Sequence, residues 1–160
     1  MMKEIRILSR HGIQYIKDLR NQQVSPLFRG RPVSVEGITE SETDMLHSLC
    51  PSGAIDGSTG SIDLGRCVFC RECEFALPGR VKFLNDYRIA ANRREDLVIK
   101  PGSVETLRLH EPSIRPDIRR VFRNSLKLRQ VSAGGDNSSE MELNATGNVN
   151  FDLGRYGIEF

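Results

Sequence analysis

The chain is poor in the features that build large cores or membrane spans. Only 6% of its 160 residues are aromatic and 38% are hydrophobic, which predicts one modest core with extensions. No apolar run approaches the roughly 20 residues that a membrane-spanning helix requires. We therefore expect a small soluble protein without a transmembrane helix.

Strong net charge and targeting signals are also missing. The formal net charge of +2 is too small to imply nucleic-acid binding, and no nucleic-acid recognition motif is present. Residues 1–10 are charged and contain no apolar core of a secretory signal. The sequence therefore predicts a protein of the reducing cytoplasm, in which disulfides are rare.

The residue sets typical of bond-making catalysis do not occur. We find no Ser/His/Asp constellation, no phosphate-binding glycine loop and no paired catalytic carboxylates. The three histidines, His11, His47 and His110, are scattered, and we expect His47 to have a surface or packing role although it lies just before Cys50. No catalytic site is expected within this chain.

What the sequence does contain is four cysteines that fit one site. Cys67, Cys70 and Cys73 form a C-x-x-C-x-x-C run, and Cys50 lies upstream, followed by Pro51. In bacterial ferredoxins such a run gives three thiolates to one cluster, and a distant Cys-Pro thiolate supplies the fourth. The spacing predicts one 4Fe-4S cluster held by all four cysteines.

A second cluster is not expected. Counting with the same spacing places its ligands at Glu40, Thr43, Leu46 and Leu77, none of which is a thiol. The sequence is thus similar to a two-cluster ferredoxin module that has kept one cluster. Structural zinc is the main alternative, because four thiolates in C-x-x-C spacing also suit a tetrahedral site. The third closely spaced cysteine and the Cys-Pro pair favour iron–sulfur.

The predicted fold class is α+β. We expect an N-terminal arm at residues 1–30, a ferredoxin-like single-cluster module at 31–91, a linker at 92–116 and a tail at 117–160. Within the module we expect a strand at 32–36, a helix at 40–49, a hairpin at 54–64, a helix at 69–76 and a strand at 81–84. Met45, Leu46 and Leu49 are expected to fill the space of the lost cluster.

Helices are also predicted in the arm and in the tail. In the arm, Ile13, Ile16, Lys17 and Arg20 have helical spacing. The tail is expected to form a helix, a strand, a short helix and a strand. In its first helix Pro116 lies near the start, and Ile118, Val121 and Phe122 should face inward. A basic stripe is predicted on the opposite side, formed by Arg115, Arg119, Arg123 and Lys127. It suits either an acidic subunit or an anionic membrane surface, or it is simply solvated.

Several segments resemble a known family. They are Phe28–Pro32, Cys50–Ile55, Ile62–Cys73 and Asn85–Arg88. Together they are similar to the ferredoxin-type electron-transfer subunits of energy-converting nickel-iron hydrogenases, which are related to complex I. The tail, at Ser125–Gly134, Glu140–Asn144 and Phe151–Gly157, resembles the start of the hydrogenase small subunit, the counterpart of the complex I subunit that holds the terminal cluster.

The resemblance to the small subunit ends where its metal would bind. The family pattern is Gly-x-Cys-Asn-Gly-Cys-Glu, and this chain has Asp136 and Ser139 at the two cysteine positions. A carboxylate and a hydroxyl are poor replacements for thiolates, so we expect no cluster there. The tail is expected to pair with another chain or to pack on the module, because it cannot bury both faces of a sheet alone.

The function that these observations predict is one-electron relay within a hydrogenase-like or complex I-related oxidoreductase. Ile55, Val68 and Phe69 are expected to exclude water from the cluster, and Arg66 and Arg71 to stabilise its reduced state. The alternative is a structural or assembly subunit whose cluster mainly holds the fold. The resemblance implies other redox subunits as partners: a nickel-iron large subunit, a small-subunit-like chain, and ferredoxin as donor or acceptor. Membrane association is expected only peripherally, on the cytoplasmic face and through such a complex.

Overall fold

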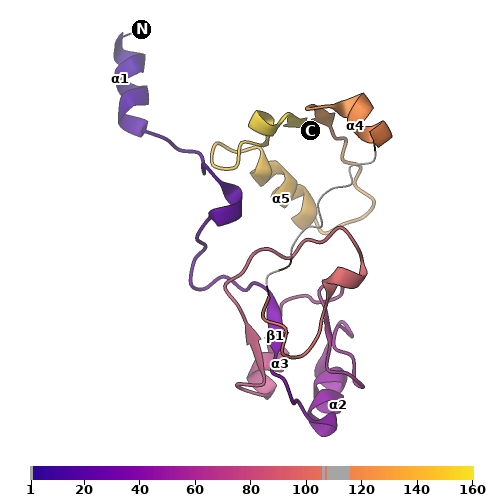
Figure 1. The fold of residues 1–160 in the computed structure, drawn as a ribbon. Helices are drawn as coiled ribbons and strands as arrows, with labels where there is room; N and C mark the ends of the chain where they lie inside the picture. The colour runs from indigo at the N-terminus through magenta and orange to yellow at the C-terminus, as the bar shows by residue number, and fades with distance from the viewer. Residues whose placement is uncertain (1, 106, 108–115) are drawn as a thin grey trace. The chain divides into compact units, whose positions relative to one another are not determined.

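The computed structural model describes residues 2–105, 107 and 116–160, and the chain divides into two compact units (Figure 1). The central unit is Val24–Pro112, and the terminal unit combines Met1–Gln23 with Ser113–Phe160. Helices alternate with two-stranded sheets, so the expected α+β class is confirmed. Among the described residues, no helix has the length and apolar character needed to cross a membrane.

Helices and short strands alternate along the described residues of the central unit. They are β1 (Pro32–Ser34), α2 (Glu40–Leu49), β2 (Ile62–Asp63), α3 (Glu72–Ala76), β3 (Val81–Phe83), the 3-10 helix η2 (Glu95–Leu97) and β4 (Val98–Ile99). The helix expected at 40–49 and the strands expected near 32 and 81 are confirmed. The helix expected at 69–76 begins later, at Glu72, because Arg71 has a left-handed backbone with a φ of 71°.

Two antiparallel pairs of strands organise this unit. β1 pairs with β3, with Val33 opposite Lys82, and β2 pairs with β4, with Ile62 opposite Ile99. Part of the segment predicted as a linker, 92–116, thus belongs to a sheet. The predicted hairpin at 54–64 is confirmed, since Ile55 bridges Ile62 and the Asp63 N–H donates to the Ala54 carbonyl at 2.8 Å.

Helix α2 begins with a capping box. The Thr39 hydroxyl accepts from the Glu42 N–H, and the Glu42 carboxylate accepts from the Thr39 N–H at 2.8 Å. Leu46 is 1% exposed, whereas Met45 and Leu49 are exposed. Of the three apolar side chains predicted to pack inward, only Leu46 does so, because the other two lie on the outer side of the helix.

The core of the central unit consists of two apolar clusters. The first contains Leu46, Ile55, Ile62 and Val81, and partly buried side chains of Ile38, Cys50, Cys73, Leu77 and Phe83 pack against it. The second contains Val33, Leu64 and Ile99, with Leu84, Ile89, Leu97 and Leu107 around it. Two of the cysteines therefore lie beside the main core.

The segments Phe28–Pro32 and Asn85–Arg88 lie together. The Arg31 N–H donates to the Asp86 carbonyl at 3.0 Å, and the buried Arg31 guanidinium pairs with the Asp86 carboxylate at 3.6 Å. Arg31 also donates to the Val104 carbonyl at 2.9 Å. These contacts attach the start of β1 to the segment that follows β3.

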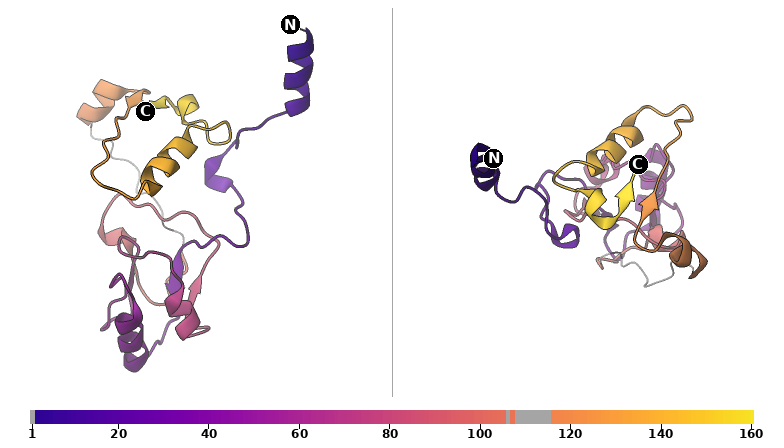
Figure 2. Two further views of the ribbon diagram at one scale, coloured as in Figure 1. Left: turned by 180° about the vertical axis from the view of Figure 1, so that it is seen from behind. Right: turned by 90° about the horizontal axis from the view of Figure 1, so that it is seen from above.

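The terminal unit contains α1 (Met2–His11), the 3-10 helix η1 (Leu19–Asn21), α4 (Pro116–Phe122), β5 (Leu126–Lys127), α5 (Ser138–Thr146), the 3-10 helix η3 (Leu153–Tyr156) and β6 (Ile158–Glu159). β5 and β6 are parallel neighbours, with Leu126 opposite Ile158 (Figure 2). The Ile16 N–H donates to the Asn150 carbonyl at 2.8 Å, which joins the two parts of the chain that make this unit.

Two expectations for this unit are wrong. The helix expected at Ile13–Arg20 lies earlier, at α1, because Gly12 ends it with a φ of 63°. Helix α4 does begin at Pro116, but Ile118, Val121 and Phe122 are 43%, 70% and 42% exposed instead of facing inward.

The predicted basic stripe is not one helical face. Arg123 has a φ of 49° just after the end of α4, and Lys127 lies in β5, so Arg119, Arg123 and Lys127 do not continue along one helix. Arg115, the first residue of that stripe, is outside the described residues, as is His110.

Candidate metal centre

The four cysteines occupy three adjoining segments of the central unit. Cys50 is the C-terminal cap of α2, Cys67 and Cys70 lie in the loop between β2 and α3, and Cys73 is in α3. All four are free thiols and half-buried. Electrostatic interactions couple Cys67 to Cys50, Cys70 and Cys73, so the other three thiols lie within electrostatic range of Cys67.

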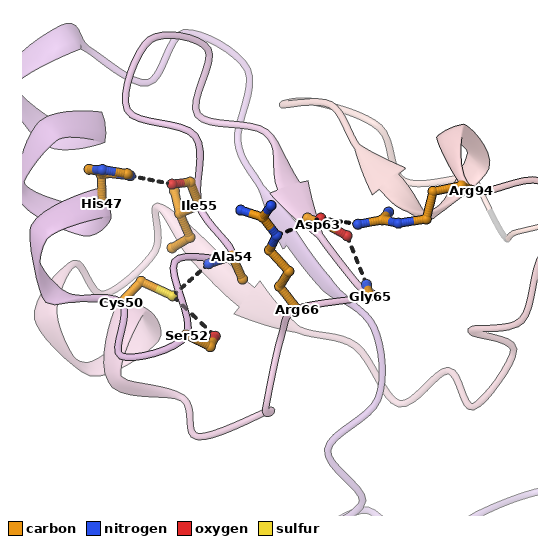
Figure 3. Close-up of polar contacts among 9 residues, drawn as sticks. All are labelled: His47, Cys50, Ser52, Ala54, Ile55, Asp63, Gly65, Arg66 and Arg94. Carbon is orange, nitrogen blue, oxygen red and sulfur yellow. Dashed lines mark hydrogen bonds and ion pairs between the residues drawn. The ribbon is translucent and has the colours of Figure 1, made fainter.

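The Cys50 sulfur is surrounded by hydrogen-bond donors (Figure 3). The Ala54 N–H donates to it at 3.3 Å, and the Ser52 hydroxyl oxygen lies 3.7 Å away. Burial raises the pKa of the Cys50 thiol, but the donors on Ala54, Ser52 and Ile55 outweigh burial and leave this pKa below its ordinary value. The loop after α2 thus favours a thiolate at Cys50.

The loop from Cys67 to Cys73 has an unusual backbone. Phe69 and Arg71 both have positive φ, at 54° and 71°, although neither is glycine. Each such residue costs on the order of 1–2 kcal/mol and persists only where the surrounding contacts impose it. The turn places the Phe69 backbone nitrogen 3.4 Å from the Cys67 sulfur, and the N–H donates a hydrogen bond to this sulfur.

Side chains outside the cysteine motif hold this loop. Arg29 donates to the Phe69 carbonyl at 3.5 Å, and the Phe69 ring meets the Phe83 ring edge to face at 6.4 Å. Glu74 accepts from the Arg71 guanidinium and from the Phe83 N–H at 3.4 Å. The roles of Arg29 and Glu74 could not be predicted from the sequence, because a contact made across the fold leaves no local pattern there.

Two of the thiols resist ionisation. Burial, and then the neighbouring Cys67 and Cys70, raise the pKa of Cys73 to about 11. Burial is also the main reason why the pKa of Cys67 is raised, and Cys50 and Cys70 add to it. A group of thiolates at this place requires a positively charged centre among them, which is the electrostatic condition that a metal or a cluster fulfils.

A network of charged side chains around Asp63 lies at the beginning of the cysteine loop. Asp63 accepts from the Gly65 N–H at 2.8 Å, pairs with Arg66 at 3.6 Å and binds Arg94 (Figure 3). The Arg94 hydrogen bond is the main reason why the pKa of Asp63 is lowered. The Cys67 N–H donates to the Asp63 carbonyl at 3.0 Å, so this network fixes where the cysteine loop begins.

The residues expected to exclude water from the site or to supply positive charge differ in their exposure and in their partners. Ile55 is 3% exposed and can exclude water, whereas Val68 is 62% exposed and cannot. Arg66 and Arg71 each have a carboxylate partner, Asp63 and Glu74 respectively, which reduces the positive charge that either offers to a cluster.

His47 is bound to the backbone. Its Nδ1 lies 2.6 Å from the Ile55 carbonyl oxygen, which can only accept, so the proton is on Nδ1 (Figure 3). This supports the expected packing role. His11 is exposed on the terminal unit.

Asp136 and Ser139 lie at the start of α5. The Asp136 carboxylate accepts from the Ser138 hydroxyl at 2.6 Å and from its N–H at 3.0 Å, and these two bonds lower the pKa of Asp136. In the part of the chain that the structure describes, no three or more His, Cys, Asp or Glu side chains are arranged to hold a single metal ion.

No protein-family model matches the chain, and no curated protein matches it either.

Proposed function

We propose that the protein is an iron–sulfur electron-transfer subunit that binds one 4Fe-4S cluster through Cys50, Cys67, Cys70 and Cys73. The observation that supports this proposal is the C-x-x-C-x-x-C run with its upstream Cys-Pro pair, whose four thiols are free and half-buried and two of which accept backbone N–H bonds. Such N–H donors at cysteine sulfurs tune iron–sulfur sites. When bound, the cluster supplies a one-electron redox change.

The chain's own residues provide the environment for that change. The N–H groups of Ala54 and Phe69 offset negative charge on two sulfurs, and Ile55 keeps water from the inner side. The exposed Val68 leaves the outer side of the loop accessible to a redox partner.

The resemblance described above extends this proposal to partners and location. We infer that the module is ferredoxin-like and serves a hydrogenase-like or complex I-related oxidoreductase complex in the cytoplasm. A nickel-iron large subunit, a small-subunit-like chain and ferredoxin are the proposed partners, and membrane attachment would be peripheral, through the complex.

A structural or assembly role is the second candidate. Cys50 and Cys73 pack against the main apolar cluster, so a metal centre at these sulfurs would also hold the core together. In that case the cluster, or a zinc ion in its place, contributes to folding without passing electrons.

Metal analysis and redox titration of the anaerobically purified protein distinguish these two functions. Iron, sulfide and zinc are quantified per chain, and the electron paramagnetic resonance spectrum is followed through a redox titration. Four irons and four sulfides with a reversible signal are expected for electron relay. The same cluster without a reachable redox step supports the structural role, and one zinc without sulfide refutes the cluster.

A further inference from the structure

The described part of the terminal unit lacks an apolar core of its own. The buried hydrophobic residues of the structure are Val33, Leu46, Ala54, Ile55, Ile62, Leu64, Val81 and Ile99, and all of them lie in the central unit. In contrast, neither α4 nor α5 contains a buried residue, and Val121 and Val131 are 70% and 78% exposed. Parallel strands such as β5 and β6 are ordinarily covered on both faces.

An open groove of about 850 Å³ lies along these strands. Ile118 and Phe122 of α4, Leu126 of β5, and Tyr156 and Ile158 at the other side give it an apolar lining. Its shape depends on Gly157, because a Cβ there would lie 1.9 Å from the Asn124 carbonyl oxygen. The Leu126 N–H donates to the Gly157 carbonyl at 2.7 Å, which fixes the two sides of the groove to each other.

All charged side chains in the described lining of the groove are positive. Arg119, Arg123 and Arg155 line it, and its described lining contains no Asp or Glu. The Arg155 guanidinium lies 4.8 Å from the ring centres of Tyr15 and Tyr156 and donates to the Ile16 carbonyl, so it is held in place. The terminal unit as a whole has 12 Lys and Arg against 8 Asp and Glu, whereas the central unit has 11 against 13.

We propose that this groove binds an acidic amphipathic helix of a partner protein. The apolar face of that helix would cover β5 and β6 and supply the core that the terminal unit lacks. Its carboxylates would pair with the three arginines at the edge of the groove, where charge complementarity decides which partner is accepted. This inference goes beyond electron transfer and does not depend on what the cysteines hold.

A synthetic helix tests the proposal with the full-length protein. The probe is a peptide of about 18 residues with leucine at helical spacing on one face and glutamate elsewhere. Binding is measured by fluorescence anisotropy of the labelled peptide. The double variant Arg119→Glu/Arg123→Glu is compared with Arg120→Glu/Arg129→Glu, which makes the same change in charge outside the groove. Circular dichroism and hydrogen exchange of α4 and α5 show that both variants fold.

The groove variant is expected to lose affinity about tenfold or more, and the control less than about threefold. A third variant, Phe122→Ala, is expected to weaken binding without altering charge. Equal losses in the two double variants, or no binding by the unaltered protein, would overturn the proposal. So would binding to phosphatidylglycerol vesicles but not to the peptide, because that outcome identifies a membrane surface. A protein that lacks iron but binds the peptide would refute only the proposed electron transfer.

Discussion

Gly30 lies where two backbone segments meet, and its missing side chain is what allows them to meet. A Cβ at this position would be 2.2 Å from the Asp86 carbonyl oxygen and 2.7 Å from the Asp86 nitrogen, and backbone atoms cannot move aside as a flexible side chain can. The contact also places the neighbouring Arg31 over the Asp86 carboxylate. A single residue thus secures the start of β1.

Gly30→Ala is therefore expected to lower the free energy of unfolding by about 2 kcal/mol or more, because the added methyl overpacks a rigid contact. Gly135→Ala is the matched control, since a Cβ there meets nothing nearer than 3.8 Å. Urea unfolding followed by circular dichroism measures both. An unchanged midpoint in Gly30→Ala would contradict this account of the contact.

Asp56 makes a pH-dependent contribution to the hairpin at 54–64. Its carboxylate accepts from the hydroxyls of Ser58 and Thr59 at 2.7 and 2.8 Å, and chiefly these bonds lower its pKa from 3.8 to about 2. Because the pKa is lower in the folded state, this stabilisation is present above the unfolded pKa and is lost as the pH falls towards about 2.

The difference in urea midpoint between the protein and Asp56→Asn should accordingly be largest above about pH 5 and shrink through about pH 3. A difference that stays constant over this range would show that the carboxylate is not the stabilising species.

At the scale of elements, the short helix α3 depends on contacts that its own sequence does not supply. It is five residues long, begins after a left-handed Arg71 without a side-chain cap, and contains no buried residue. Glu74 ties it to the preceding residue through Arg71 and to β3 through the Phe83 N–H. The position of Cys73 follows from these ties.

The substitution Glu74→Ala should loosen the attachment of α3 to Arg71 and to β3. It leaves the Phe83 N–H without its acceptor and the Arg71 guanidinium without its partner, which together cost about 1–3 kcal/mol. If a cluster is bound, iron loss to a chelator should be several times faster than in the unaltered protein. Glu72→Ala, an exposed position in the first turn of the same helix, is the control and should behave as the unaltered protein does. Equal iron-loss rates in the two variants would refute the role of Glu74.

At the scale of the whole molecule, the two units differ in what stabilises them. The central unit contains both apolar clusters and all four cysteines, whereas the terminal unit has exposed apolar side chains and a short parallel pair of strands. Metal binding at the cysteines should therefore act on one unit only.

Removing the metal with a chelator under reducing conditions is expected to lower the hydrogen-exchange protection of α2, α3 and β3, because Cys50 and Cys73 pack against the core that these elements share. Protection of α5 should not change. Exchange measured by mass spectrometry distinguishes the segments, and an equal loss in α5 would show that the units unfold together.

Much of the central unit could be predicted because its patterns are local. Helix α2 has apolar residues at helical spacing, and the hairpin has glycines around its turn, so both were predicted close to their observed bounds. The cysteine spacing predicts a thiol site from a local pattern of the same kind. The arm was predicted less well, because the spacing of Ile13 and Ile16 resembles a helix while Gly12 ends the helix before them.

The sequence alone determined the residue types that can bind metal, the α+β class and the start of α4 at Pro116, because these follow from covalent chemistry and short-range backbone preferences. Only the tertiary structure decided which sulfurs are buried, which arginines are paired, and which apolar side chains remain exposed. Those properties depend on residues far apart in the chain, as with Arg29 and Phe69 or Gly157 and Asn124, and their contacts exist only after folding.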